Sequence, residues 1–324
     1  MFKKNLFAIV YSVLLTAFTV YVLMDTFVIT RVYSTVPAVE SGPEAGSAVA
    51  DSDSAVAEAA STAEQAASAP AQSSGSPANQ SPVSTATSYQ DENITITLTQ
   101  YREYDTSIYV ADITLSSPEY LQTALAQNAY GRNVTEKTSE MAVENGAILA
   151  INGDYYGAQE SGYVLRNGVL YRDIAERGQE DLVIYEDGSF EIITEDEVTA
   201  QELLDRGAVQ ILSFGPALVT GGDVSVTAGE EVGKARSSNP RTAIGVIDDL
   251  HYVFVVSDGR TDESEGLSLY QLAEFMSELG AETAYNLDGG GSSSMVFNGN
   301  VINNPTTSGN RIKERSVSDI VYIG

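Results

Sequence analysis

The most distinctive chemistry-bearing stretch of the chain is NLDGGGSSS, residues 286–294. One carboxylate is followed by three glycines and then by serines: Asp288, Gly289, Gly290, Gly291, Ser292 and Ser293. Successive glycines let the backbone approach a ligand closely and adopt conformations closed to other residues. Their amides can bind an anion, and the serine hydroxyls add donors. A loose Gly-Ser connector is the alternative, but such connectors rarely separate two apolar strands with an acid at the junction.

A second candidate is INGDYYG, residues 151–157, in which an apolar run stops at a carboxylate and two aromatic rings. Tyr155 and Tyr156 offer flat apolar faces for sugars and hydroxyls for sugar edges. Asn152 and Asp154 could hydrogen-bond to the same ligand. A strand-ending turn with packed tyrosines would have the same sequence, so the interpretation depends on the neighbouring stretches.

Arginines provide a third feature. Arg241 begins the apolar run TAIGVI, so its guanidinium could project into a pocket at the mouth of a strand. A planar fork of donors matches phosphate oxygens, although an exposed arginine at a strand start is equally ordinary. Arg260 ends the stretch SDGR and precedes an acidic loop, residues 262–265. Clustered carboxylates attract calcium, but the spacing is not that of an EF-hand, and a solvated loop is the simpler interpretation. We therefore predict no metal or other cofactor, with calcium at this loop not excluded.

Composition restricts the partners. The chain has 324 residues, 45 acidic and 17 basic side chains, and a formal net charge of -28. So acidic a protein will not bind nucleic acid through its overall field, and a phosphate must be held by a few placed arginines. The chain has no Cys, which excludes disulfides and thiolate chemistry and points to a bacterial origin for an exported protein.

Residues 1–36 predict a membrane anchor. Lys3 and Lys4 precede an apolar run of about 25 residues, long enough to cross the hydrocarbon layer. The run is longer than the apolar region of a cleaved signal peptide. A cleaved signal peptide is the competing interpretation. The positive-inside tendency would leave a short cytoplasmic tip. We therefore expect a single-pass protein of the cell membrane, with its long carboxyl side in the extracytoplasmic cell envelope.

Residues 37–88 predict a linker, and residues 89–324 predict one catalytic domain. The linker is almost wholly Ala, Ser, Pro, Glu, Gln, Thr and Gly, a composition typical of disorder. Alternating strand-like runs begin at Tyr89, and ITITLTQY with IYVADITL suggests an antiparallel pair. Helical spacing occurs in PEYLQTALAQ, TSEMAVEN and SLYQLAEFMSEL, and Asn167-Gly168 and Asp187-Gly188 predict hairpin turns. The predicted fold class is α+β, with a single mixed sheet.

In order along the chain, the motifs resemble those of the phosphodiester glycosidase family. The similar stretches are INGDYYG (151–157), SFGPALV (213–219), NPRTAIGV (239–246), SDGR with SEGLSLYQLAEFM (257–276), YNLDGGGSSSMV (285–296) and ERSVSD (314–319). The resemblance spans nearly all of the folded part. It implies hydrolysis of the bond between a sugar anomeric carbon and a phosphodiester oxygen, and hence a glycan or sugar-phosphate substrate, for which wall or capsular polymers fit the expected location.

The residues suggest roles for such a reaction. A carboxylate must activate water or stabilise charge on the sugar ring, and Asp288 is the leading candidate, with Asp154 as the second carboxylate and Glu314 behind it. Arg241 is the first choice for the phosphate, helped by Arg260 and Arg315. The remaining predicted substrate contacts are Asn152, Tyr155, Tyr156, the three glycines, Ser292 and Ser293. All of this requires Asp288 and Arg241 to share one hollow.

Two other functions remain open from the residues. A metal-dependent phosphodiesterase would cut the P–O bond, and it usually needs several His or Cys ligands that this chain lacks. The single histidine, His251, opens an apolar run, so we interpret it as structural or exposed and a Ser-His-Asp hydrolase is not favoured. A non-catalytic module that binds wall glycans is the second alternative, although neutral glycans do not require two carboxylates beside an arginine.

Overall fold

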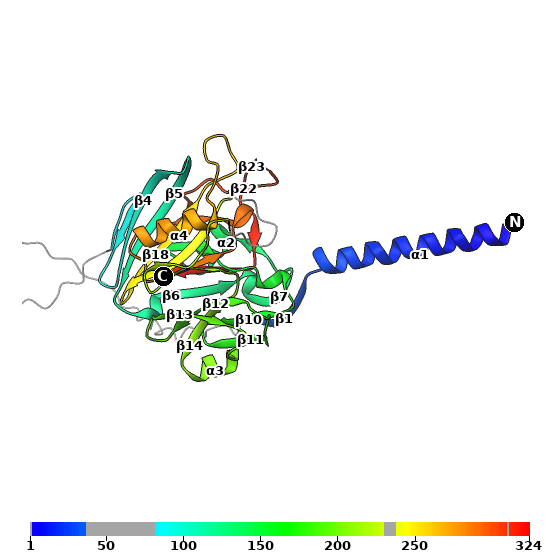
Figure 1. Ribbon diagram of the computed structural model, residues 1–324, viewed down its shortest axis with the longest axis horizontal. Coiled ribbons are helices and arrows are strands. Elements are labelled where there is room, and N and C mark those ends of the chain that lie inside the picture. The colour runs from blue at the N-terminus through cyan, green and yellow to red at the C-terminus, as the bar shows by residue number, and fades with distance from the viewer. Residues whose placement is uncertain (1, 37–81, 230–237, 310) are drawn as a thin grey trace, which may run out of the picture. The chain divides into compact units, whose positions relative to one another are not determined.

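The computed structural model describes residues 2–36, 82–229, 238–309 and 311–324 (Figure 1). Three larger sheets of antiparallel strands form the folded part. The first has nine strands in the order β16-β15-β19-β17-β18-β5-β4-β3-β2. Their bounds, in that order, are Asp223–Val224, Ala217–Thr220, Thr283–Leu287, Thr242–Asp248, His251–Ser257, Thr106–Leu115, Ile94–Glu103, Ser88–Gln90 and Val83–Ser84.

The second and third sheets have five strands each. The second runs β21-β20-β9-β25-β6, with bounds Asn300–Val301, Met295–Phe297, Leu149–Asn152, Asp319–Ile323 and Leu121–Leu125. The third runs β11-β10-β14-β12-β13, with bounds Val169–Ile174, Gly162–Arg166, Ala208–Leu212, Glu180–Tyr185 and Phe190–Thr194. Apolar residues of all three sheets meet in one core cluster, which includes Phe254, Ile151 and Leu182.

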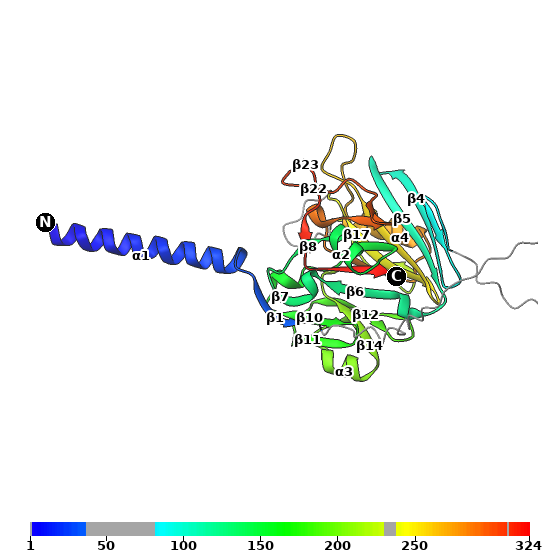
Figure 2. The same cartoon turned by 180° about the vertical axis from the view of Figure 1, so that it is seen from behind.

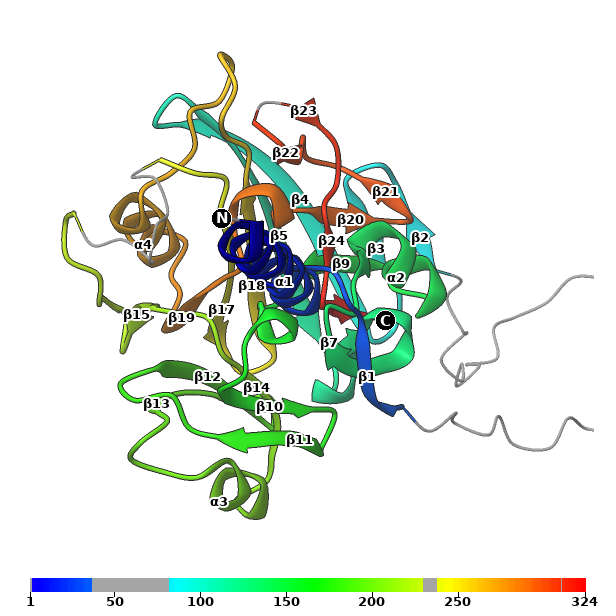
Figure 3. The ribbon, with the colours of Figure 1, turned by 90° about the vertical axis from the view of Figure 1, so that its right-hand side faces the viewer.

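One helix covers part of the other face of each sheet. Helix α4 (Leu269–Glu278) packs on the nine-stranded sheet, α2 (Thr138–Glu144) on the β9 sheet, and α3 (Ala200–Asp205) on the β10 sheet. Figure 3 shows α4 beside β15 and β19, and α2 beside β9 and β20. Figure 2 shows α3 next to β11 and β14, seen from behind. An apolar stripe on each helix therefore closes a separate satellite core.

Short elements connect these layers. Three two-stranded ladders pair β1 (Arg31–Thr35) with β7 (Ala129–Arg132), β8 (Glu136–Lys137) with β24 (Ser316–Val317), and β22 (Thr306–Thr307) with β23 (Arg311–Ile312). The 3-10 turns are η1 (Pro118–Tyr120), η2 (Ala126–Asn128), η3 (Tyr156–Ala158) and η4 (Gly290–Ser292). Two of these turns, η3 and η4, belong to stretches that the sequence singles out.

The predicted single mixed sheet is wrong, because the strands form several sheets and every described pairing between them is antiparallel. The helix predicted over PEYLQTALAQ is also wrong. Leu121–Leu125 forms β6, which pairs along its length with β25, so non-local pairing overrides a helical apolar spacing. Several sheets that share one core, each with a helix on part of its other face, can bury apolar residues on both faces of their strands.

Other local predictions are confirmed. The runs ITITLTQY and IYVADITL lie in β4 and β5, which pair antiparallel. Asn167 and Gly168 both have positive φ in the turn between β10 and β11, and Asp187-Gly188 lies between β12 and β13. Helices α2 and α4 form where predicted, α4 being capped by Ser268. Helix α3 is an element that the sequence interpretation missed.

At the amino-terminal end, α1 spans Phe2–Phe27. Within the described residues, no helix has both the length and the apolar character that crossing a membrane requires. The predicted membrane-spanning segment is therefore not confirmed. The predicted linker, residues 37–88, falls mostly outside the described residues. Its last part is described, and Val83–Ser84 forms β2, so ordered strands begin before the predicted boundary at Tyr89.

Candidate active site

Adjacent strands bring the Asp288 and Arg241 stretches together. Strands β17 and β19 pair antiparallel, with Thr242 opposite Leu287. Arg241 precedes Thr242 and Asp288 follows Leu287, so the two residues come next to each other where the ladder ends. The amide of Gly290 donates a 2.8 Å hydrogen bond to the carbonyl of Pro240, which fixes the loop against the neighbouring strand. The structure therefore places the two backbones side by side, and a hollow shared by the two side chains stays a prediction.

A different arginine lies near each glycine of the loop, and at Gly290 it is the nearest neighbour. A Cβ on Gly290 would lie 2.6 Å from Arg260 Nη2. A Cβ on Gly289 would lie 2.9 Å from the Pro240 carbonyl oxygen, with Arg241 Cδ at 3.9 Å, and one on Gly291 would lie 3.1 Å from Thr307 Oγ1, with Arg315 Cδ at 3.3 Å. Gly290 also has φ +63°, in the left-handed region that favours glycine. The absence of a side chain thus makes room for the Arg260 guanidinium at Gly290, for the Pro240 carbonyl at Gly289 and for the Thr307 hydroxyl at Gly291.

Asp288 is half-buried at the start of this loop. Ser292 donates a 2.6 Å hydrogen bond from Oγ to Asp288 Oδ2. Burial raises the pKa of Asp288 to about 6, although the Ser292 hydroxyl, the Arg315 charge and the Gly289 amide oppose the rise. The carboxyl is therefore mostly ionised at neutral pH yet close enough to its pKa to exchange a proton.

Asn152, at the end of β9, holds the backbone of Asp288. Its Nδ2 donates 2.6 Å to the Asp288 carbonyl, while its Oδ1 accepts from Thr242 Oγ1 at 2.8 Å and from the Ser294 amide at 3.2 Å. Asn152 is fully buried, and both ends of its amide are used inside the protein. This geometry favours positioning of the loop over the direct contact with sugar hydroxyls that the sequence suggested.

A buried arginine that the sequence interpretation missed holds the stretch after β9. Arg166 Nη2 lies 2.7 Å from Asp154 Oδ2 and 2.7 Å from Asp319 Oδ2. Burial opposes the charge of Arg166, but the two carboxylates outweigh it and raise its pKa. Burial, together with the Asp154 charge, raises the pKa of Asp319 to about 7 against the lowering effect of Arg166.

Asp154 has little capacity left for a substrate. Besides Arg166, it accepts hydrogen bonds from the amides of Tyr156 (2.9 Å) and Ser213 (3.0 Å). Its side chain is fully buried. The next residue back, Gly153, donates its amide to the Asp319 carbonyl and accepts from the Asp288 amide at 3.2 Å. Asp154 and Arg166 therefore shape the backbone that supports Asp288.

The two tyrosines predicted to contact the substrate differ in exposure. Tyr156 is fully buried and stacks on Tyr130 with ring centroids 5.5 Å apart, so it belongs to the core. Tyr155 is 38% exposed, and the Arg315 guanidinium lies 5.9 Å from the centre of its ring. Of the pair, Tyr155 is the ring that a ligand at the glycine loop could reach.

The three arginines differ in exposure. Arg241 is buried, and its Nε donates 2.9 Å to the Leu267 carbonyl. Arg260 is half-buried and donates from Nε (3.1 Å) and Nη2 (3.0 Å) to Asn239 Oδ1. Arg315 is exposed. Exposure therefore makes Arg315 the most accessible of the three to a substrate from solvent.

Two predicted residues have different surroundings from those expected. Glu314 accepts from the Ser139 amide (3.1 Å) and from Ser139 Oγ (2.6 Å) in the first turn of α2, an arrangement typical of a helix cap. No described contact joins Glu314 to either aspartate. Ser293 is buried, and its Oγ has no hydrogen-bond partner among the described residues.

Asp258, in the SDGR motif, has a structural role. Its Oδ1 accepts the Asn304 amide at 2.7 Å, and its Oδ2 accepts the Tyr109 hydroxyl at 3.2 Å. The preceding Ser257 accepts the Arg241 amide on its Oγ at 2.9 Å. This motif therefore fixes the neighbours of the glycine loop.

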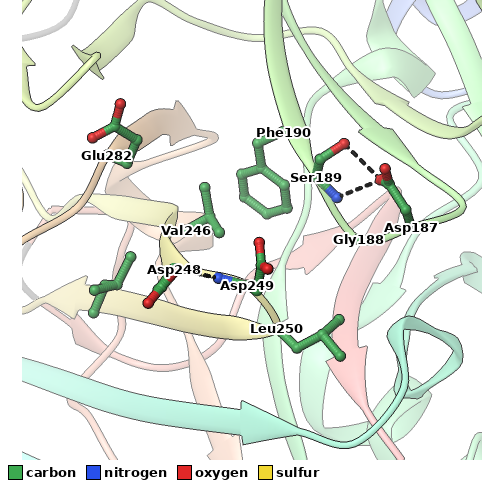
Figure 4. Close-up of a pocket in the computed structure, with 10 residues that line it drawn as sticks. Asp187, Gly188, Ser189, Phe190, Val246, Asp248, Asp249, Leu250 and Glu282 are labelled. Atoms are coloured by element: carbon green, nitrogen blue, oxygen red, sulfur yellow. Dashed lines mark hydrogen bonds between the residues drawn. The ribbon is translucent and has the colours of Figure 1, made fainter.

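A cavity of about 580 Å³ lies elsewhere, between the β12–β13 and β17–β18 turns (Figure 4). Phe190, Val246 and Leu250 line it together with four acids, Asp187, Asp248, Asp249 and Glu282. Such a lining repels an anionic substrate.

Among the described residues, no group of three or more His, Cys, Asp or Glu side chains could hold a metal ion.

Comparison with known proteins identifies the family. Residues 145–324, more than half of the chain, match the phosphodiester glycosidase family. The chain belongs to this family. The match contains the glycine loop, all three loop arginines and the Arg166 triad.

Two curated relatives of this phosphodiester glycosidase domain match over similar lengths. The SPbeta prophage-derived uncharacterized protein YomE of Bacillus subtilis is 30% identical over 180 residues, which cover 54% of this chain and 28% of that protein. The mouse N-acetylglucosamine-1-phosphodiester alpha-N-acetylglucosaminidase is 28% identical over 184 residues, covering 52% of this chain and 35% of the mouse protein. The chain thus spans about a third of the length of these relatives.

Solved structures agree with the fold. The zebrafish N-acetylglucosamine-1-phosphodiester alpha-N-acetylglucosaminidase catalytic domain, auto-inhibited by its pro-peptide, aligns with a TM-score of 0.56 and 21% identity. The alignment covers 71% of this chain and 82% of that one. A hypothetical protein from Synechocystis aligns with a TM-score of 0.52 and 16% identity, covering 72% and 62% of the two chains. These similarities support the sheet-rich architecture.

The buried triad gives a stability prediction. Arg166→Met removes the cation between two buried carboxylates, which should lower the free energy of unfolding by about 3–5 kcal/mol at neutral pH. Without Arg166 the pKa of Asp319 rises further above its unfolded value. Protonation of Asp319 then stabilises the folded state at acidic pH, and this contribution is lost as pH rises through the raised pKa. The deficit measured by urea unfolding should therefore shrink as pH falls.

Arg206→Met is the matched control. Arg206 also pairs with a carboxylate, Glu191 at 2.8 Å, and lies 5.8 Å from the centre of the Tyr185 ring, but its side chain is 51% exposed. Arg206→Met should lower the free energy of unfolding by less than about 1 kcal/mol at any pH. Equal effects of the two substitutions would show that the triad has no special structural role.

Proposed function

We propose that this domain hydrolyses the bond between a sugar anomeric carbon and a phosphodiester oxygen. The main supporting observation is the loop from Asp288 to Gly291, in which one acid is followed by three glycines, each with a different arginine near it. A sugar phosphodiester needs both kinds of group, because negative charge must be held on the phosphate while a carboxylate acts at the anomeric carbon. Membership of the family supports the same reaction.

Arg315 is the proposed phosphate ligand, with Arg241 and Arg260 behind it. Arg315 is exposed, lies over Tyr155 and is near enough to Asp288 to lower its pKa. Arg241, the first choice from the sequence, is buried and donates to the Leu267 carbonyl. We assign Arg241 to orienting the loop and adding positive potential, and Arg315 to direct contact through its planar fork of donors.

Asp288 is the proposed catalytic carboxylate. In its ionised form it takes a proton from water as the water oxygen attacks the anomeric carbon. The bond from that carbon to the phosphodiester oxygen breaks, and its electron pair leaves on the phosphate. Phosphate is a stable leaving group, so the reaction needs little help from a general acid. The products are a free sugar and a phosphomonoester.

Asp154 has a supporting role in this proposal. Its carboxylate is bound to Arg166 and to two amides, which suits positioning of the Asp288 loop better than a second catalytic carboxylate. Tyr155 would face the sugar, and Asn152 would hold the loop from behind.

An extracytoplasmic location and a wall or capsular substrate belong to the same proposal. The absence of cysteine and the Ala/Ser/Pro/Glu-rich composition of residues 37–88 support them. Protease added to intact cells should degrade the domain if it lies outside the cytoplasm, and full protection would contradict this location.

Product analysis tests the reaction. The full chain incubated with UDP-N-acetylglucosamine should release reducing sugar, and Asp288→Asn should lower kcat by about a hundredfold or more because the carboxylate acts only in the transition state. Asp187→Asn is the matched control. Asp187 also precedes a glycine and accepts a serine hydroxyl at 2.6 Å, but in a hairpin turn. It should retain activity.

Other products would redirect the assignment. A phosphomonoester that still carries the sugar would mean P–O cleavage by a phosphodiesterase. Binding of a wall glycan without any product would mean a binding module. Near-normal turnover by correctly folded Asp288→Asn would remove that residue from its role.

The pH profile tests the state of Asp288. Because ionised Asp288 is the active form, kcat/KM should rise with pH through about 6 and then level off. Ser292→Ala removes a hydrogen bond that favours the ionised form, so the midpoint should move to higher pH. Ser189→Ala, which removes the equivalent bond to Asp187, should leave the profile unchanged. A midpoint that Ser292→Ala does not move would exclude Asp288 as the titrating group.

Gly290→Ala tests the packing of arginine against the loop. A Cβ there would lie 2.6 Å from Arg260 Nη2, so the Arg260 guanidinium must shift, and kcat should fall by about tenfold or more if its placement matters. Gly299→Ala is the control, because Gly299 has φ +74° but nothing within 4 Å of a new Cβ. Both should lose about 1–2 kcal/mol of stability from backbone strain. If Gly299→Ala loses activity as Gly290→Ala does, backbone strain and not the placement of Arg260 would be the cause.

A further inference from the structure

A cavity of about 380 Å³ lies among β1, β7, β11 and η3, and Tyr155 is not among its lining residues. Its lining includes the tyrosines Tyr33, Tyr130 and Tyr171 and the arginines Arg31, Arg132 and Arg172, and we refer to it as the tyrosine–arginine cavity. Figure 3 shows β1 beside β7, with β10 and β11 nearby. The volume falls in the range of small-molecule sites.

The tyrosines form a connected set of rings. The Tyr130 ring centre lies 5.8 Å from that of Tyr33, 5.5 Å from that of Tyr156 and 5.0 Å from that of Tyr171. Tyr33 is 60% exposed, and Tyr171 is half-buried. Partly open rings of this kind offer flat apolar faces and hydroxyl groups to a sugar.

Arg172 provides a buried charge that has no carboxylate partner among the described ion pairs. The residue is 9% exposed, and its Nη2 is buried without a hydrogen-bond partner among the described residues. Its Nε and Nη1 donate to backbone carbonyls, including those of Gly162 at 2.6 Å and Gln159 at 2.8 Å. Burial raises the pKa of Tyr130, and Arg172 opposes the rise through its charge and through a side-chain hydrogen bond. A neutral hydroxyl is a weaker partner for a guanidinium than an anion, so an anionic ligand would bind Arg172 more favourably.

The other charges around the cavity are paired. Arg132 Nη1 lies 2.6 Å from Glu160 Oε1, and Arg31 pairs with Asp25. Asp173 Oδ1 accepts the Ala200 amide at 3.1 Å. Asp173 keeps its negative charge, so the three arginines of the cavity are balanced by Asp25, Glu160 and Asp173. Arg172 donates to neutral carbonyls, so an anion could bind its guanidinium without displacing a carboxylate.

We propose that the tyrosine–arginine cavity binds a phosphorylated sugar. Arg172 and Arg132 would receive the phosphate, because a guanidinium fork matches its oxygens, and Tyr171 with Tyr33 would cover the sugar ring. Tyr156 lines this cavity, whereas its neighbour Tyr155 lies under Arg315, and neither Tyr155 nor Arg315 lines the cavity. The inference does not depend on the proposed hydrolysis.

Calorimetry on the full chain tests the site with glucose 6-phosphate as the probe. Binding should weaken by about tenfold or more in Arg172→Lys, which keeps the charge but loses the fork, and several-fold in Tyr171→Ala. Arg315→Ala should bind the probe normally, which separates this cavity from the glycine loop. Both cavity variants should hydrolyse UDP-N-acetylglucosamine like the unmodified chain, if the chain is active.

Other results would overturn the proposal. These are no binding of glucose 6-phosphate at millimolar concentration, or loss of binding in Arg315→Ala rather than in the cavity variants. Inorganic phosphate that binds as tightly as glucose 6-phosphate would refute the sugar contact, and glucose that binds as tightly would refute the charge contact. If Arg172→Lys fails to fold, Tyr171→Ala and the exposed Tyr33→Ala decide the question.

Discussion

The candidate site depends on one buried arginine between two carboxylates. Arg166 on β10 bonds to Asp319 on β25 and to Asp154 after β9, so a single guanidinium joins two sheets. Desolvation offsets most of the attraction between such charges, so we infer that the triad mainly fixes which backbones meet. The backbone it fixes includes Gly153, whose carbonyl receives the amide of Asp288.

The glycine loop depends on that support and adds a second constraint. Its backbone is held from one side by Asn152 and from the other by the carbonyl of Pro240, while the Arg260 guanidinium occupies the space that a side chain at Gly290 would take. A catalytic carboxylate needs this kind of fixed surrounding, because a rigid arrangement of charges does not have to reorganise during the reaction. The same packing leaves Asp288 partly exposed beside Arg315, where a substrate can reach both.

Part of the fold and of the candidate site could be predicted from local sequence patterns. The Asn-Gly and Asp-Gly turns, the β4–β5 pair and the Ser268 cap of α4 follow from short-range rules, and the order of motifs pointed to the glycine loop. The triad could not be predicted, because an arginine before a hairpin turn ordinarily lies on the surface and only the fold buries Arg166. Adjacent tyrosines with opposite exposure, Tyr155 and Tyr156, likewise differ only in tertiary context. The number of sheets depends on pairings between distant segments, which apolar periodicity does not contain.

Strand β25 has a consequence for how the molecule forms. It lies inside its sheet, between β9 and β6, and Tyr322 bonds to Gln122 across 200 positions of sequence. Non-local pairing of this kind slows folding, because chain entropy is lost before contacts compensate for it. During synthesis, the edges of β6 and β9 that pair with β25 stay unpaired until β25 has left the ribosome. Over that interval the nascent chain exposes apolar strand edges, and chaperone binding is a natural protection against aggregation.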